Sequence, residues 1–152
     1  MMLPEIRLLM PGDEDLLVTL FGDVVPEWRD RLVAAPSGVT AYLADPTTFV
    51  FAAVVGAEPA GLAYGSLMPY PDGRRMAYLH ELGVAETFRR RGIGAMLVRA
   101  AMDWSRERGA AKFWLSTGGH NEVAQALYEH LGGDRKPLGD VNYWWTLDPT
   151  PS

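Results

Sequence analysis

The fold is decided by a basic, glycine-containing stretch that reads Val84-Ala85-Glu86-Thr87-Phe88-Arg89-Arg90-Arg91-Gly92-Ile93-Gly94-Ala95. An apolar run over residues 76–84 leads into it, and a helix-like pattern over residues 93–108 follows. A strand, a basic turn and a helix in this order present backbone N–H groups and the positive end of a helix dipole to an anion. We therefore expect residues 85–95, called the basic turn below, to bind a pyrophosphate group.

The residue types of the basic turn suit this role. A side chain at either glycine would keep a phosphate from approaching the main chain, and arginine side chains add charge-assisted, often bidentate contacts to phosphate oxygens. The alternative is a solvated basic turn in which the glycines serve only backbone geometry. On the binding interpretation, the contacts come from Arg89, Arg90, Arg91, Gly92, Ile93, Gly94 and Ala95.

Two other phosphate-binding motifs are excluded by the residues after Gly94. A P-loop needs Lys and then Ser or Thr after its glycine, but Ala95 and Met96 stand there. The dinucleotide fingerprint needs a third glycine where this chain has Leu97. The remaining pattern is Arg-x-x-Gly-x-Gly, beginning at Arg89.

The periodicity of apolar residues predicts an α/β fold with a mixed sheet. Consecutive strands joined by short turns favour antiparallel pairing, and the later strand–helix–strand crossover favours a parallel pair. The short segment Pro36-Ser37-Gly38 is interpreted as a break between helices. Strands are expected at 5–10, 49–55, 60–68, 75–84, 112–116 and 141–147, and helices at 13–21, 26–35, 39–43, 93–108 and 121–131.

Composition limits the classes of function. The 152 residues are 48% hydrophobic, which suits one domain with a sizeable core, so residues 1–152 are assigned to a single domain. Cysteine is absent and the three histidines are scattered, so neither thiolate catalysis nor a metal site is predicted. No apolar run is long enough to cross a bilayer and no signal peptide is visible. We therefore expect a cytoplasmic protein with no membrane partner.

The net charge of −5 bears on the partner. Proteins that bind nucleic acid rely on basic surface, so no nucleic-acid partner is expected. An acidic cleft concentrates cations, which favours a small cationic molecule. The same charge also aids solubility, and that explanation stays open.

Two motifs together resemble the GNAT superfamily of acetyl-CoA-dependent N-acetyltransferases. One is the pattern at Arg89, Gly92 and Gly94, and the other is Asn121-Glu122-Val123-Ala124-Gln125-Ala126-Leu127-Tyr128-Glu129-His130-Leu131-Gly132. The resemblance covers about residues 49–147. It implies a GNAT-like fold, with a mostly antiparallel sheet of about six to seven strands, a splayed parallel pair and about four helices. It also implies acetyl-CoA as the donor, no metal, and a pyrophosphate held by the basic turn.

The second motif carries the first candidate catalytic residue. Asn121, Ala124 and Tyr128 recur at i, i+3 and i+7, so one helix face presents all three. The resemblance implies that Tyr128 protonates the departing coenzyme A thiolate and that Asn121 and Ala124 adjoin the pantetheine arm. A positioned O–H donor lowers the barrier to expelling a sulfur anion. The alternatives are a half-buried aromatic at Tyr128 and a simple N-cap at Asn121.

The apolar strand before the basic turn carries the second candidate. A carboxylate at Glu81, inside a strand that should be buried, needs a reason. Desolvation would raise its pKa, as a general base for an ammonium substrate requires, although pairing with an arginine is the alternative. In a regular strand His80 would point to the opposite face. The resemblance further implies main-chain contacts from Leu82, Gly83 and Val84 to the thioester and pantetheine.

Within the superfamily, short pieces of the chain resemble aminoglycoside 3-N-acetyltransferases. These are the strand acid with its non-proline loop at 81–86, the helix at 123–128 and an aromatic chain end. The resemblance implies a small cationic amine as acceptor. The alternatives are another small amine, a protein N-terminus or lysine, and a module that binds acetyl-CoA without turnover. Dimers are frequent in this superfamily, so the resemblance allows a homodimer, and the sequence leaves the oligomeric state open. Candidate acids for the acceptor are Glu27, Asp30, Glu81, Glu122 and Asp140.

Overall fold

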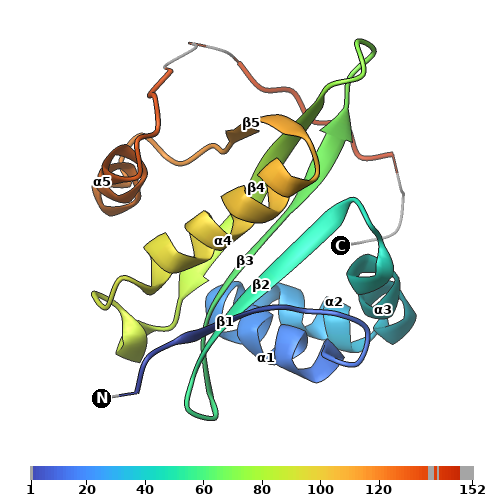
Figure 1. Cartoon of the computed structure of the whole chain (residues 1–152). Helices are drawn as coiled ribbons and strands as arrows, with labels where there is room; N and C mark the ends of the chain where they lie inside the picture. The colour runs from blue at the N-terminus through green and yellow to red at the C-terminus, as the bar shows by residue number, and fades with distance from the viewer. Residues whose placement is uncertain (1, 137–138, 140, 148–152) are drawn as a thin grey trace.

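A five-stranded sheet organises the computed structural model, which describes residues 2–136, 139 and 141–147 (Figure 1). The strands lie in chain order, and the first three pairings are antiparallel while the last is parallel. The mixed sheet expected from the sequence is therefore confirmed. The strands are β1 (Glu5–Leu8), β2 (Thr48–Val55), β3 (Glu58–Pro69), β4 (Arg75–Val84) and β5 (Ala110–Trp114).

Helices cover both faces of this sheet. Figure 1 shows α4 crossing one face and α1, α2 and α3 gathered beside β1, β2 and β3. The predicted break between helices is present but lies at residues 34–35 rather than 36–38, because Pro36 occupies the first turn of α3, where its missing N–H costs nothing. The helices are α1 (Glu14–Val24), α2 (Arg29–Val33), α3 (Pro36–Ala44), α4 (Ile93–Glu107) and α5 (Glu122–His130), with 3₁₀ turns η1 (Pro26–Trp28) and η2 (Glu86–Phe88).

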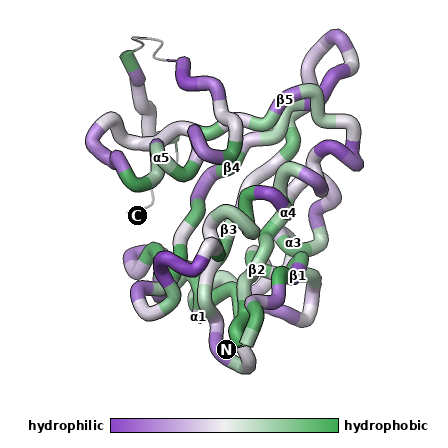
Figure 2. Tube along the Cα trace, turned by 60° about the vertical axis from the view of Figure 1, so that its left-hand side comes forward, coloured by the Kyte–Doolittle hydropathy of each residue, from purple (hydrophilic) through white to green (hydrophobic). Residues whose placement is uncertain are grey.

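The alternation of side chains along β2 creates two cores. Phe49 and Phe51 pack with α4, whereas Val50 and Ala52 pack with α1 and α3 on the opposite face. Hydrophobic residues accordingly gather on the central strands in Figure 2. The sheet is thus buried on both faces at its centre. Among the described residues, none of the helices is both long and apolar enough to span a membrane.

The parallel pair β4–β5 separates partway along. Their register ends at Tyr78↔Trp114, whereas β4 continues to Val84 and stays paired with β3 over that length. One side of residues 79–84 therefore has no strand partner within the described part of the chain. The backbone groups on that side are available to a ligand.

A β-bulge lies in the same part of β4. Tyr64 of β3 pairs with Glu81, but the next β3 residue, Gly65, pairs with Leu79. His80 is therefore the extra residue of the bulge. Such an insertion breaks the regular alternation of side chains along a strand and re-aims them.

The predicted strand at 141–147 is wrong, since these residues are described and form no strand. Their large side chains are exposed, with Tyr143 at 75% and Trp144 at 92%. Strand propensity reflects how well a side chain fits a half-buried pleated surface. These aromatic side chains do not pack on such a surface in this structure. The described sheet therefore has five strands rather than six or seven.

A close contact joins α1 to the free part of β4. A Cβ atom added at Gly83 would collide with both methyl groups of Val24, in the last turn of α1. Glycine inside a strand often marks such a close approach. Gly83 thus allows the end of α1 to lie against the strand that borders the separated pair.

We expect Gly83→Ala to lower the free energy of unfolding by about 1–3 kcal/mol, because overpacking forces the helix and the strand apart. Urea denaturation followed by circular dichroism measures the change. Gly38→Ala is the matched control, because its new methyl group meets only ordinary contacts inside α3 and should stabilise by about 0.4–1 kcal/mol. The double variant Gly83→Ala/Val24→Ala should regain part of the loss. Unchanged stability of Gly83→Ala would contradict the packing argument.

Candidate functional site

A cavity of about 800 Å³ occupies the space between the separated strands. Its walls come from the unpaired side of β4, the chain just after β5, the basic turn with the start of α4, and one face of α5. Residues 79–84 of β4 and residues 115–117 after β5 both line it. The separation of β4 from β5 is therefore what makes room for a ligand.

The basic turn brings the start of α4 to this cavity. No side chain caps this helix, and its first turn holds no acid. The first N–H groups of a helix have no partner within the helix, so those of Ile93, Gly94 and Ala95 are available to an anion. All three residues line the cavity.

The two glycines of the basic turn have different structural roles. Gly92 has φ of 77° and caps α4 in the left-handed region, which glycine adopts without steric cost. A Cβ atom at Gly94 would lie 3.3 Å from Cδ2 of Leu127. Gly94 therefore lets α4 and α5 approach closely, in addition to keeping the main chain accessible.

The three arginines are placed differently. Arg89 and Arg90 line the cavity, and the Nε–H of Arg89 donates to the carbonyl oxygen of Val84 at 3.1 Å, which ties the turn to the end of β4. Arg90 has φ of 65°, a conformation that is strained for a residue with a side chain. Arg91 does not line the cavity, and its guanidinium lies 5.3 Å from the ring centroid of Phe88.

The face of α5 predicted to meet the cavity does so. Asn121, Ala124 and Tyr128 all line it. Asn121 is also the N-cap, since its side-chain oxygen accepts a hydrogen bond from the N–H of Ala124 at 3.1 Å. Burial, and then the charge of Glu81, raises the pKa of Tyr128. Its phenol therefore stays protonated at neutral pH and can donate.

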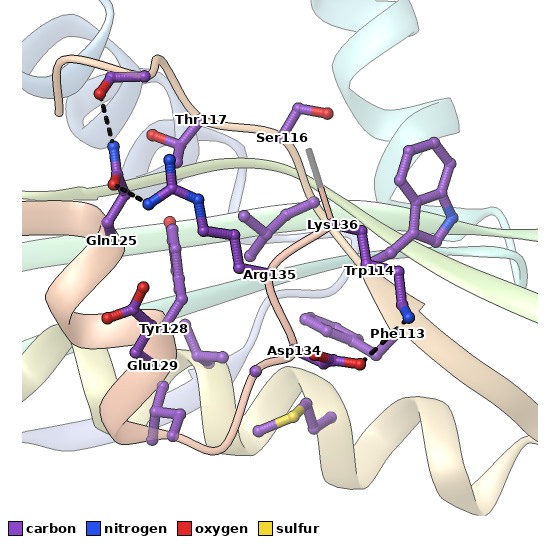
Figure 3. Close-up of a pocket in the computed structure, with 16 residues that line it drawn as sticks. Phe113, Trp114, Ser116, Thr117, Gln125, Tyr128, Glu129, Asp134, Arg135 and Lys136 are labelled. Atoms are coloured by element: carbon purple, nitrogen blue, oxygen red, sulfur yellow. Dashed lines mark hydrogen bonds and ion pairs between the residues drawn. The ribbon is translucent and has the colours of Figure 1, made fainter. Parts of the chain in front are cut away.

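A second cavity of about 480 Å³ adjoins the first, and Tyr128 lines both (Figure 3). Gln125 helps to fix the wall, because its side-chain N–H groups donate to the carbonyl oxygens of Gly118 and Gly119 at 3.1 and 3.0 Å. Arg135 in turn donates to the side-chain oxygen of Gln125 at 3.2 Å. These contacts hold the loop before α5 against the helix that carries Tyr128.

Glu81 reaches the cavity from β4. Burial is the main cause of its raised pKa, and the negative charge of Glu27 adds to it. The charge of Glu81 also raises the pKa values of Tyr64 and Tyr128. The carboxylate therefore interacts both with the phenol on α5 and with an acid from the N-terminal helical region.

The bulge changes the expected position of His80. Regular alternation would separate it from Glu81, but His80 also lines the cavity and stacks on Tyr64, the cross-strand partner of Glu81. Its Nε2 lies 3.1 Å from Oγ of Ser66. Burial lowers the pKa of His80, so the imidazole is neutral at neutral pH.

The acids predicted for the acceptor separate into three groups. Glu81 lines the cavity and Glu27 acts on it through charge. Asp30 and Glu122 do not line it. Asp140 lies outside the described residues.

Among the lining residues that sequence reasoning missed, Asp23, Ser116 and Thr117 carry polar side chains. Asp23 carries a signal, because an acid in the last turn of a helix opposes the helix dipole, and a broken local rule often marks a functional site. Ser116 and Thr117 follow β5 and carry no comparable signal. The described residues contain no group of His, Cys, Asp or Glu side chains that could hold a metal ion.

Two named acetyltransferases are similar in sequence to part of this chain. Streptothricin acetyltransferase from Streptomyces lavendulae is 36% identical over 89 residues, which are 59% of this chain and 45% of that protein. Aminoglycoside N(6′)-acetyltransferase type 1 from Klebsiella aerogenes is 34% identical over 93 residues, 59% of this chain and 61% of that protein. The chain thus spans about half the length of these curated relatives.

Solved structures share the fold. An aminoglycoside acetyltransferase from an uncultured soil metagenomic sample aligns with a TM-score of 0.85 and 22% identity, covering 95% of this chain and all of that one. Aminoglycoside N-acetyltransferase AAC(6′)-Iy in complex with CoA aligns with a TM-score of 0.81 and 20% identity, covering 97% of each chain.

The cavity fits the donor of such enzymes. It offers uncapped helix N–H groups, two arginines, a glycine at positive φ and an unpaired strand side, which together suit a pyrophosphate and an amide-bearing arm. Acetyl-CoA is the typical acetyl donor of GNAT enzymes. The model of the Acetyltransferase (GNAT) family matches residues 15–133, and the chain therefore belongs to this family of acetyltransferases.

Proposed function

We propose that this domain acetylates a primary amine of a cationic aminosugar of the aminoglycoside class, with Glu81 as general base and Tyr128 as general acid. The observation that carries the proposal is the convergence of these two side chains on one cavity that the basic turn also lines. A base and an acid with raised pKa values, acting on each other through charge, suit proton transfer in opposite directions.

Acetyl-CoA, when bound, supplies the acetyl group as a thioester. Arg89, Arg90 and the N–H groups at residues 93–95 would hold its pyrophosphate. Main-chain groups of Leu82, Gly83 and Val84 on the unpaired side of β4 would hold the pantetheine arm, and Asn121 and Ala124 face the same space. The N–H groups of β4 are also placed to polarise a carbonyl oxygen.

Glu81 takes the proton that an alkylammonium must lose before its nitrogen can attack. A raised pKa makes the carboxylate a stronger base than an exposed glutamate. The nearby negative charge of Glu27 both raises that pKa and attracts a cationic acceptor. His80, neutral and adjacent, does not compete for the cation by charge.

Tyr128 holds its proton for the sulfur that leaves. Its raised pKa keeps the O–H intact throughout the neutral range, and half-burial limits exchange of that position with water. The backbone of α5 is fixed by its Asn121 cap and by Gln125, which keeps the phenol directed at the cavity. A fixed donor needs little reorganisation during the reaction.

The choice of acceptor rests on charge and on the named relatives. The chain carries a net charge of −5, and Asp23, Glu27 and Glu81 act at or line the cavity. Two of the similar proteins above are named for the 6′ position of aminoglycosides, while our sequence-based hypothesis specified the 3-N position. We propose aminoglycosides as the class of acceptor. Analysis of the acetylated product distinguishes transfer to the 3-N position from transfer to the 6′ position.

Tyr128→Phe tests the function and the acid together. In a thiol-release assay with acetyl-CoA, we expect the unaltered protein to act on kanamycin-, gentamicin- or apramycin-type sugars in preference to simple amines and peptides. The variant should lose about 10²–10⁴-fold in turnover, because only the proton donor is removed, with coenzyme affinity unchanged. Tyr70→Phe, on the exposed β3–β4 connection, is the control. Equal turnover of Tyr128→Phe and Tyr70→Phe would exclude the acid role of Tyr128. Preference of the unaltered protein for a peptide would contradict the proposed aminoglycoside acceptor.

The arginines give a second prediction. Arg89→Ala should weaken coenzyme A binding by roughly ten- to a hundredfold, as expected for loss of a charge-assisted hydrogen bond, when measured by isothermal titration calorimetry. Arg91→Ala is the matched control and should change the dissociation constant little, because this guanidinium lies over Phe88 outside the cavity. The placement of the pyrophosphate would be wrong if Arg91→Ala had the larger effect.

Glu81→Gln gives a pH-dependent prediction. The unaltered enzyme should lose activity as pH falls through the raised pKa of Glu81, and the variant should lack this acid limb and most activity. Folded Glu81 binds its proton more tightly than the unfolded chain, whose ordinary pKa is 4.5, so stability falls as pH rises above that value. The variant should therefore melt higher than the unaltered protein at pH 7, and the gain should vanish below about pH 4.5. A lower melting temperature at pH 7 would contradict the desolvation argument.

A further inference from the structure

A continuous row of six rings crosses the sheet face that carries α1. Neighbouring ring centroids are 6.2, 4.9, 5.6, 4.8 and 4.3 Å apart. Four of the spacings lie within the range of about 4.5–7 Å that aromatic pairs prefer, and the Tyr78–Trp114 spacing of 4.3 Å is slightly shorter. In order, the rings are Trp28, Phe21, Tyr64, His80, Tyr78 and Trp114.

Both ends of the row are exposed, but only one of them adjoins the large cavity. Trp28 is 40% exposed, lies 5.6 Å from the guanidinium of Arg31, and is separated from the cavity-lining ring of His80 by the buried ring of Phe21. His80 is exposed and Trp114 is 45% exposed, with half-buried Tyr78 between them. These three side chains, His80, Tyr78 and Trp114, are called the ring platform below.

The ring platform adjoins the proposed chemistry. Its first member, His80, lines the large cavity and precedes Glu81 in the bulge. Tyr78 and Trp114 form the last pair of the β4–β5 register, directly before the strands separate. Helix α1 packs mainly against β3 rather than β4. An acceptor on the platform would therefore lie next to the cavity that Glu81 lines.

Charges of opposite sign lie at the two ends of the ring platform. At its His80 end lie Glu81 and, acting on it through charge, Glu27. At the Trp114 end lies Lys112, two residues earlier on β5 and so on the same face of the sheet. A polycation on the platform is attracted toward Glu81 and repelled from the far end.

We propose that the ring platform is the floor of the acceptor subsite and takes a sugar ring of a polycationic aminosugar, with one ammonium group directed to Glu81. The proposal rests on the proposed function and names its specificity-determining residues. A pyranose ring presents a face of C–H groups that packs on an aromatic surface, and ammonium groups are attracted to aromatic faces. An acyclic polyamine has the charges but lacks the flat apolar face.

The test compares kanamycin with spermidine, a polycation without rings, by isothermal titration calorimetry on the coenzyme A-bound protein. Trp114→Ala and Tyr78→Leu should weaken kanamycin binding about tenfold and leave spermidine within about twofold. Trp114→Phe should restore most of the affinity. The matched controls Trp144→Ala and Tyr70→Leu remove exposed rings elsewhere and should leave both ligands unchanged. In the thiol-release assay, Trp114→Ala and Tyr78→Leu should raise KM for kanamycin and leave KM for acetyl-CoA unaltered.

The outcomes separate the two proposals. If kanamycin binding is weaker in the platform variants but the unaltered protein releases no thiol with kanamycin, the platform is supported and the transfer reaction is excluded. Thiol release with kanamycin at an unchanged KM in Trp114→Ala and Tyr78→Leu would overturn the platform and leave the reaction standing. Equal losses for kanamycin and spermidine, or no kanamycin binding by the unaltered protein, would also overturn the platform.

Discussion

The separation of β4 from β5 beyond Tyr78 and Trp114 is the constraint on which this structure depends. A parallel pair normally satisfies the backbone groups of both strands. Here β4 continues alone on that side within the described part of the chain, so its free side borders a cavity. The basic turn brings the start of α4 to that cavity, and the bulged part of β4 brings Glu81 and His80 to it. The proposed donor site and the candidate base therefore depend on two irregularities of the sheet, the separation of β4 from β5 and the bulge in β4.

Local patterns were sufficient to predict most elements. The stripe expected over residues 93–108 is α4, Ile93–Glu107, because an amphipathic helix beside a buried sheet agrees with its own periodicity. The strand at 141–147 was predicted wrongly, because aromatic content says nothing of whether an edge with a buried face is available. The mixed α/β class and the family are confirmed. The cytoplasmic location and the lack of a nucleic-acid partner stay predictions, and the oligomeric state stays open.

The site shows the same division. Tyr128, Asn121 and Ala124 could be grouped in advance because helical spacing fixes which side chains share a face. The orientation of His80 could not be predicted, since a bulge depends on the register with β3 and leaves no mark in the strand's own residues. Arg91 could not be distinguished from its two neighbours, because a run of three arginines does not say which side chain stacks on Phe88.

The contact between Gly83 and Val24 has a consequence for how such a scaffold acquires new acceptors. It ties the end of α1 to the part of β4 that lines the large cavity, so that end cannot shift without changing the shape of the proposed donor site. The short segments after it, η1 and α2, contribute no buried side chain and are free of this tie. Remodelling of substrate range, in nature or in the laboratory, therefore has its widest latitude over residues 26–33.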